Sequence, residues 1–276
     1  AGGTSAAWTS GTFSSSFTSG VWSTRSALNT AVQLTTGAGT QSDSKIMGGD
    51  TSPAGGGGDT LNPVSEVQDW NGTAFTTGTP MTTIRNGATG GGESGSATWI
   101  AGGISTVGSE VYVNNMLIWN GSTWSAGGNL TYSGGAQGGC GNVDSGLTIT
   151  YYNAGTSDVV NSYDGTTWTT GAVFPYSSGS AQSSGAGQNN DAIITSGNGY
   201  SVESWTYDGL AWTRGGDTAH LSTESANMGT PRNAMNCMGY VGSNIWNPTW
   251  AELYNGTTWS ATGSMVTGRV TGGHGN

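Results

Sequence analysis

Hydrophobic positions in this chain form short runs bounded by Gly, Ser, Thr and Asn. Val67, Leu117, Val159, Val202 and Leu253 lie in such runs, and an aromatic residue follows each of them within five residues. Short runs of this kind favour strands, and no stretch shows the 3.6-residue period of an amphipathic helix. The pattern predicts an all-β protein made of many short strands.

One phrase ends these runs: an aromatic residue, Asn or Asp, Gly, two further residues and a second aromatic residue. Its first aromatics are 49, 44, 44 and 47 residues apart. The five copies contain the aromatic pairs Trp70/Phe75, Trp119/Trp124, Tyr163/Trp168, Tyr207/Trp212 and Tyr254/Trp259, with glycines at Gly72, Gly121, Gly165, Gly209 and Gly256. Trp8 and Phe13 form a sixth, degenerate copy with the same offset. Self-similarity at a fixed period indicates a repeat architecture.

Each phrase has the composition of a β-hairpin turn. Asn-Gly and Asp-Gly are preferred in type I′ turns, because both central residues of such a turn need φ > 0. The two aromatics then fall on opposite strands, where they can pack across the hairpin or onto a neighbouring sheet. We therefore expect Trp168 and Trp212 to be buried between sheets.

Units of 44–49 residues with four short strands have the size of one blade of a β-propeller. A β-solenoid usually has much shorter rungs, and a β-sandwich does not impose a repeat of this length. We expect a single domain over residues 1–276 with six four-stranded blades. Five repeats and one closing blade, in which residues 1–20 join residues 266–276, would cover the chain; the repeats span about 21–79, 80–129, 130–174, 175–218 and 219–265.

Other recurring residues carry a family resemblance. Gly pairs occur at Gly48-Gly49 and Gly102-Gly103, and a Met-x-x-x-Arg segment ends at Arg85 and again at Arg269. Together with the spaced aromatic pairs, these residues resemble the kelch repeat family, which implies a β-propeller. The short Asn/Asp-Gly hairpin departs from kelch and is similar to repeats of phage and marine bacterial surface proteins. That similarity implies a virion appendage such as a tail fibre or spike.

The composition is that of a folded, Gly-rich β protein with few charges. The chain contains 51 Gly, 12 Trp and 10 Tyr, and only 8% of its residues are charged. Disordered segments are poor in aromatics, so this composition argues against disorder. The net charge of −10 repels phosphate, and no apolar run approaches the length of a membrane helix. We expect neither nucleic acid nor membrane insertion.

The spacing of chemically reactive residues does not match known propeller enzymes. His220 and His274 lie in different units, and Cys140 and Cys237 have different offsets from their repeats. The phrase "SYDGTTW" is one residue too short for the aspartate box of sialidases. The Tyr, Cys and two His of kelch-type copper oxidases have no visible counterpart. We predict no enzymatic activity, no cofactor, and two buried cysteines in preference to a disulfide.

Calcium is the one metal for which the sequence contains candidate ligands. Asp50 and Asp59 lie on the Gly-rich run "GGDTSPAGGGGDT", and hard cations bind oxygen-rich loops. Two isolated aspartates more often cap or solvate a loop, so we predict no metal and keep these two residues as weak candidates.

Binding residues are expected on the connections between the Gly-pair strand and the hairpin. Equivalent connections project from one face of a propeller, and they are long in the first and fifth units and short in the third. Four aromatic residues lie on them and suit sugar rings: Tyr112, Tyr200, Trp246 and Trp250. Trp250 has an alternative interpretation, in which it begins the next strand and packs inward.

These observations favour a non-enzymatic recognition module on a virion or cell surface, such as a tail-fibre or adhesin domain. It would bind a host glycan or protein receptor through one rim of loops. The alternative is a structural fibre, decoration or filament subunit that assembles through its rims with other subunits, a homo-oligomer included. A glycosidase or sialidase-type propeller ranks third. We expect a virion or extracellular location.

Overall fold

The structure is a computed structural model of the 276-residue chain, and it describes residues 21–52, 61–151, 159–175, 183–195, 201–222, 225–237, 239 and 248–267. Every regular element in these ranges is a β-strand. No helix in them is long and apolar enough to cross a membrane. The strands form five four-stranded antiparallel sheets.

Each sheet is made of four strands that are consecutive in the chain. The first sheet contains β1 (Thr36–Gly39), β2 (Ser44–Met47), β3 (Val67–Trp70) and β4 (Phe75–Thr77), and the second β5 (Thr89–Ser94), β6 (Ala97–Ala101), β7 (Met116–Trp119) and β8 (Trp124–Ala126). The third contains β9 (Gly135–Asn142), β10 (Ser145–Tyr151), β11 (Val159–Tyr163) and β12 (Trp168–Thr170). The fourth contains β13 (Ser184–Gln188), β14 (Asp191–Thr195), β15 (Ser204–Tyr207) and β16 (Trp212–Arg214), and the fifth β17 (Ala226–Thr230), β18 (Asn233–Cys237), β19 (Ala251–Tyr254) and β20 (Trp259–Ala261).

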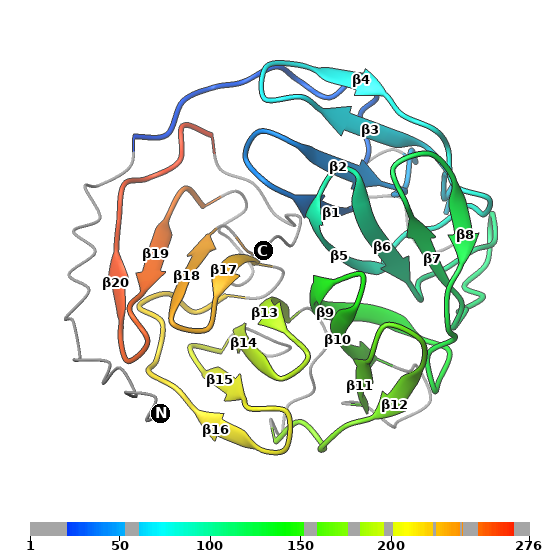
Figure 1. Ribbon diagram of the computed structural model, residues 1–276. Coiled ribbons are helices and arrows are strands. Elements are labelled where there is room, and N and C mark those ends of the chain that lie inside the picture. Colours follow the sequence, from blue (N-terminus) through cyan, green and yellow to red (C-terminus); the bar gives the residue numbers. More distant parts are fainter. Residues whose placement is uncertain are drawn as a thin grey trace, which may run out of the picture.

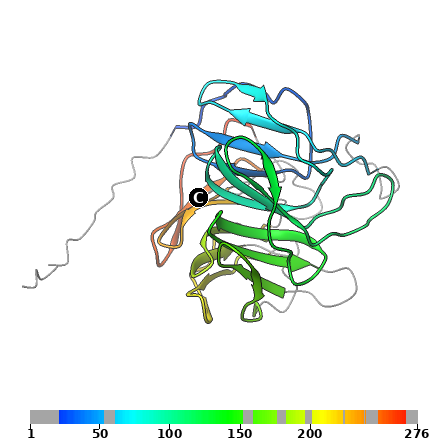
Figure 2. The same cartoon turned by 45° about the vertical axis from the view of Figure 1, so that its right-hand side comes forward.

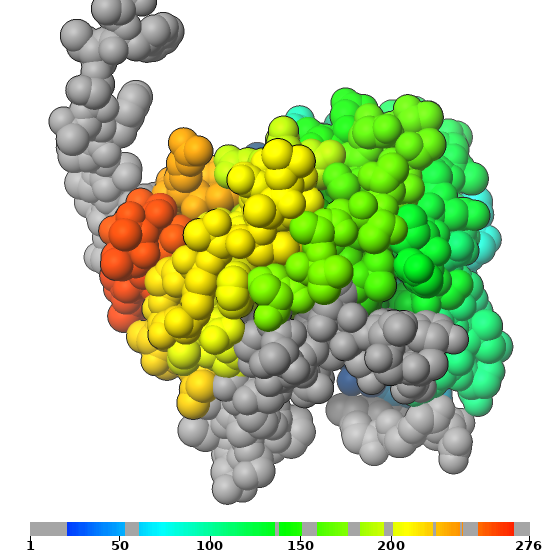
Figure 3. Space-filling model, turned by 90° about the horizontal axis from the view of Figure 1, so that it is seen from below, coloured from blue at the N-terminus to red at the C-terminus, as the bar shows by residue number. Residues whose placement is uncertain are grey.

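The five sheets are arranged around a central axis as the blades of a β-propeller (Figure 1; Figure 2 shows the same arrangement obliquely). The first strand of each sheet lies nearest the axis and the fourth lies at the outside. The innermost strands pack in succession, β1 against β5, β5 against β9, β9 against β13 and β13 against β17. From outside, the third to fifth sheets form one continuous packed surface (Figure 3).

Close approach of the innermost strands explains much of the glycine content. A Cβ atom added at Gly139 in β9 would lie 3.0 Å from Cγ2 of Thr89 in β5 and closer still to its Oγ1. Thr89 is fully buried. A side chain at this position would therefore force the two strands apart. Because glycine has none, the strands can approach closely, and a sequence rich in small residues still packs densely.

The aromatic pairs of the repeated phrase lie where the sequence predicts, directly opposite one another on the third and fourth strands. The predicted type I′ turn is wrong. The paired aromatics enclose four residues, and only the glycine has positive φ, for example 91° at Gly165. The preceding Asp or Asn instead closes the turn with its side chain. Asp164 Oδ1 accepts the N–H groups of Thr166 and Thr167 at 2.8 and 2.7 Å, an Asx turn.

The second aromatic of a hairpin also fastens its sheet to the preceding one. The indole N–H of Trp124 donates to Thr79 O in the chain that follows β4, at 2.9 Å, and that of Trp212 donates to Ala172 O after β12, at 3.1 Å. Trp168 is buried, as predicted, and its ring meets that of Trp99 edge-on at 5.5 Å. Trp212 is half-buried. The aromatics thus supply contact between sheets as well as across hairpins.

The described residues form five blades, where the sequence analysis predicted six. The segments assigned to the sixth blade, 1–20 and most of 266–276, lie outside the described residues. The first and fifth sheets are nevertheless linked, because the indole of Trp22 donates to Gly263 O at 2.7 Å and packs beside Ala226 and Cys237. Repeat counting could not show this link, since it joins residues 241 positions apart.

The two cysteines are free and buried in different sheets, Cys140 in β9 and Cys237 in β18. Burial raises the pKa of each thiol to about 12. Cys140 belongs to an apolar cluster between the third and fourth sheets, and Cys237 belongs to one that the fifth sheet forms with Trp22 and Met265. They act as small core residues in this fold.

Candidate functional site: the loop face

The two ends of the propeller differ in the length of their connections. Between first and second strands, and between third and fourth strands, the chain turns within two to four residues in all five sheets. Between second and third strands, it takes from seven residues in the third sheet to 19 in the first. Because consecutive strands are antiparallel, the tight turns share one end, the turn face, and the long connections share the other, the loop face.

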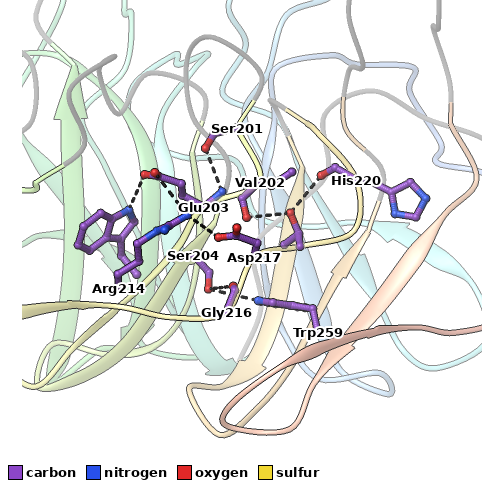
Figure 4. A network of polar contacts seen from close by, with 11 residues as sticks. Ser201, Val202, Glu203, Ser204, Arg214, Gly216, Asp217, His220 and Trp259 are labelled. Atoms are coloured by element: carbon purple, nitrogen blue, oxygen red, sulfur yellow. Dashed lines mark hydrogen bonds and ion pairs between the residues drawn. The ribbon is translucent and has the colours of Figure 1, made fainter.

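On the loop face, a polar network orders the connection that leaves the fourth sheet (Figure 4). Arg214 Nη2 lies 2.5 Å from Asp217 Oδ1 and 3.6 Å from Glu203 Oε1. Thr218 Oγ1 bonds the carbonyl oxygens of Val202 and His220, both at 3.1 Å. The network therefore fixes the backbone of the segment that carries His220.

The His220 ring lies between solvent and two residues of the fifth sheet. It stacks on the Trp250 indole with centroids 4.9 Å apart and an interplanar angle of 2°. Its Nδ1 pairs with Oε1 of Glu252. Glu252 is fully buried, whereas 40% of the His220 side chain is exposed. An acceptor on Nδ1 fixes the orientation of the imidazole and leaves the Nε2 edge to act on an outside group.

The position of Glu252 is part of the repeat. It precedes the first aromatic of its hairpin by two residues, as Gln68 and Asn161 do in the first and third sheets. In all three sheets this side chain accepts a backbone N–H of the connection leading into its own sheet: Asn29 N at 2.7 Å, Thr131 N at 3.1 Å and Ala219 N at 2.9 Å. Of these three side chains, only Glu252 also pairs with a histidine, through its second carboxylate oxygen. That addition distinguishes the fifth sheet.

Trp250 has a second unusual feature, a buried indole N–H without a hydrogen-bond partner among the described residues. Buried N–H groups are usually satisfied, so an unpaired one is uncommon. His220, Trp250 and Glu252 thus place an aromatic stack and a partly exposed imidazole at one corner of the loop face. The cluster can bind a polar ligand that also has an apolar surface.

The four aromatic residues predicted to bind ligand are not brought together in the described structure. Trp250 lies just before β19 and is buried beneath His220, with 9% of its surface exposed, in line with its inward-packing alternative. Tyr112 lies on the second sheet's loop and its hydroxyl is 3.4 Å from Glu110 Oε2. Trp246 and Tyr200 lie outside the described residues.

Asp50 is held by donors on both carboxylate oxygens. Ser52 N and Oγ bond Oδ1, and Asn62 N and Asn86 Nδ2 bond Oδ2 at 3.1 and 2.6 Å. Burial alone would raise the pKa of Asp50, but the bonds from Ser52, Asn86 and Asn62 outweigh it and the pKa is lowered. The side chain closes the base of the long first connection. Asp59, the other calcium candidate, lies outside the described residues, and within them no three His, Cys, Asp or Glu cluster around a common point.

Arg85, from the Met-x-x-x-Arg segment, is fully buried. Its Nη1 donates to Gly102 O and Asn115 O, both at 2.8 Å, and burial lowers its pKa to about 10. It joins the chain between β4 and β5 to the β6–β7 connection of the second sheet.

Sequence reasoning missed the pairing of His220 with Glu252. One signal was available: Glu252 and Tyr254 occupy the same face of a strand by the two-residue alternation, so a buried carboxylate could have been predicted there. A buried carboxylate needs partners. The identity of the partner could not be read from the chain, because His220 is 32 residues away.

Comparisons with known proteins support the fold and no finer grouping. No family model matches the chain, and no curated protein matches its sequence. Among solved structures, the one titled "Structure of YjhT" is similar with a TM-score of 0.66 and 11% sequence identity, covering 89% of this chain and 87% of its own. At this identity the likeness shows the β-propeller fold alone.

Proposed function

We propose that this protein is a non-enzymatic recognition module that binds its partner through the loop face. The observation that carries the proposal is the difference between the two faces. The turn face repeats one four-residue Asx turn in every sheet, whereas the loop face varies from sheet to sheet in length and chemistry. Variation confined to loops on a rigid scaffold is the usual arrangement of a binding surface.

The partner class we propose is a surface glycan, with a protein receptor as the second choice. An exposed imidazole stacked on an indole suits a sugar, which has an apolar face and hydroxyl edges. The net charge of −10 disfavours polyphosphate partners. A virion or cell-surface setting, such as a phage tail fibre, rests on the kelch-like and phage-type resemblance of the repeats.

Assembly as a structural subunit is the second candidate function. Val107 and Val111 are 60% and 49% exposed on the second sheet's loop, and Tyr132 is 53% exposed on the connection that follows that sheet. Exposed apolar side chains on one face favour contact with another protein surface. In that case the loop face would be covered in the native assembly.

The test is binding to an array of neutral and acidic glycans, with one substitution on each face. His220→Ala removes the exposed half of the aromatic stack, and Leu210→Ala changes an exposed residue of the turn face. We expect a bound glycan whose affinity falls about tenfold or more in His220→Ala and is unchanged in Leu210→Ala. Equal binding by both variants would contradict the loop-face assignment. A native oligomer with the loop face protected from labelling would favour assembly.

A further inference from the structure

The fourth and fifth sheets meet through polar side chains at the loop-face end of their joint. Residues directly opposite one another on neighbouring strands share a face of the sheet. On the fourth sheet, the first three strands contribute one row of this kind, Ser184, Thr195 and Ser204. On the fifth sheet, the facing row is Asn227, Asn236 and Glu252. All six side chains are fully buried.

The same repeat can close this end of a joint with apolar side chains. At the joint between the first and second sheets, the equivalent positions include Met47, Val67, Ile100 and Leu117, which belong to one apolar cluster. Burying polar groups costs free energy unless they are hydrogen-bonded. The joint between the fourth and fifth sheets therefore needs hydrogen bonds where the first joint needs none.

Hydrogen bonds across the joint supply partners at both ends of the two rows. Near the axis, the backbone N–H of Asn227 donates to Ser184 Oγ at 2.6 Å, and its Nδ2 donates to Ser184 O and Thr195 Oγ1 at 2.9 and 2.8 Å. Toward the outside, the indole N–H of Trp259 donates to Ser204 Oγ at 3.2 Å (Figure 4). These bonds hold the two sheets at a fixed spacing on either side of Asn236.

The middle of the joint contains polar atoms that the described residues leave without a partner. They are Oδ1 of Asn227 and both Oδ1 and Nδ2 of Asn236. Asn236 lies directly opposite Asn227 on one side and Glu252 on the other. Glu252 accepts Ala219 N and pairs with His220, which leaves acceptor sites on its carboxylate, because a carboxylate has about four. Buried polar groups of this kind are satisfied by protein or by ordered water.

The chemistry of Asn236 selects water as the partner. Its amide leaves both an acceptor and a donor unpaired, so the partner must donate and accept. Water does both, whereas a metal cation cannot accept the Nδ2 hydrogens. The joint also has small side chains where others have large ones. Asparagine is smaller than the isoleucine that three other sheets have at this position: Ile46, Ile100 and Ile194.

We propose that the joint between the fourth and fifth sheets is a binding site for internal water, held by Asn236 with Asn227 and Glu252 on either side. A buried water makes about three hydrogen bonds, and the row offers that number. It donates to Asn227 Oδ1 and to the Glu252 carboxylate and accepts from Asn236 Nδ2. Such water is part of the folded protein whether or not the loop face binds a partner. It also gives a further donor to the carboxylate that orients His220.

The test combines a crystal structure of the full chain, at a resolution that shows ordered water, with a count of long-lived waters in solution. We expect at least one water within about 2.7–3.2 Å of the Asn236 amide. Oxygen-17 relaxation dispersion of the solvent counts waters that exchange slowly, and Asn236→Ile should lower that count by about one. Thr148→Ile is the matched control. Thr148 has the same place in the third sheet and is fully buried, but its hydroxyl already has a partner in Asn161, so the count should not change.

Several results would reject the water site. One is an Asn236 amide that bonds Asn227 or Glu252 directly, with no water in the joint. Another is an equal count of long-lived waters in Asn236→Ile and in the unmodified chain. Density coordinated only by oxygen atoms at about 2.3–2.6 Å would identify a cation in place of water. Should Asn236→Ile not fold, the crystal structure of the unmodified chain decides alone.

Discussion

Trp168→Ala is the most informative perturbation of the packing between sheets. The ring is 6% exposed and lies 4.9 Å from Tyr163 across its own hairpin and 5.5 Å from Trp99 of the preceding sheet. Its N–H reaches Met116 Sδ at 3.2 Å. Truncation would remove contacts in two sheets and leave a cavity between them.

The expected loss follows from this burial. Replacing a buried Phe or Trp by Ala lowers the free energy of unfolding by about 3–5 kcal/mol, and an edge-to-face aromatic pair adds about 0.5–1.5 kcal/mol beyond its buried area. We therefore expect about 4 kcal/mol for Trp168→Ala. Trp212 is half-buried, so Trp212→Ala should lose distinctly less, about 1.5–3 kcal/mol.

Urea denaturation followed by tryptophan fluorescence and circular dichroism measures both losses. The matched control is Thr169→Ala, an exposed neighbour on the same strand, which should change the free energy of unfolding by less than about 0.5 kcal/mol. Coincidence of the two signals would support a single cooperative transition. A loss below about 1 kcal/mol for Trp168→Ala would refute the assignment of this ring to the joint between the second and third sheets.

Three further results are expected. Asp164 and Asp208 each have a lowered pKa, because backbone N–H groups of the turn, from Thr167 in the case of Asp164, bond the ionised carboxylate. The stability that these bonds contribute is present above the unfolded pKa of about 3.9 and is lost as pH falls through the lower folded pKa. The double variant Asp164→Asn/Asp208→Asn should therefore show a smaller decline in melting temperature between about pH 5 and pH 2 than the unmodified chain. Gly139→Ala should lose about 1–3 kcal/mol by overpacking against Thr89, and Thr89→Ala in the same chain should recover part of that loss in a double-mutant cycle. The Cys140 thiol, buried with a pKa of about 12, should react with a thiol reagent only after unfolding, so reaction at neutral pH in the native state would contradict its place in the core.

Parts of the candidate site were accessible from the sequence and parts were not. The sequence predicted that long connections would share one face, since this follows from strand order alone. It also predicted the burial of Trp168, since alternation puts that ring on the same side as its partner Tyr163. It did not predict the pairing of His220 with Glu252, because contacts across 32 residues depend on how one connection packs on the next sheet.

The turns and the contact between the first and fifth sheets likewise separate what the sequence predicts from what it does not. Asn-Gly and Asp-Gly suggested a two-residue turn, but the five-residue spacing of the aromatics sets a four-residue loop in which the Asx side chain replaces one backbone bond. Trp22 was counted in the first unit because nothing local distinguishes it. Its hydrogen bond to Gly263 places it beside the fifth sheet.

The sequence by itself determined the strands, their grouping in fours and the repeated aromatic joint, because these depend on local alternation and on a period that repeats along the chain. Only the tertiary structure decided which residues meet between sheets: Trp22 with Gly263, His220 with Trp250, Thr89 with Gly139. Such contacts depend on the angle and spacing at which whole sheets pack around the axis. No local pattern encodes those two quantities.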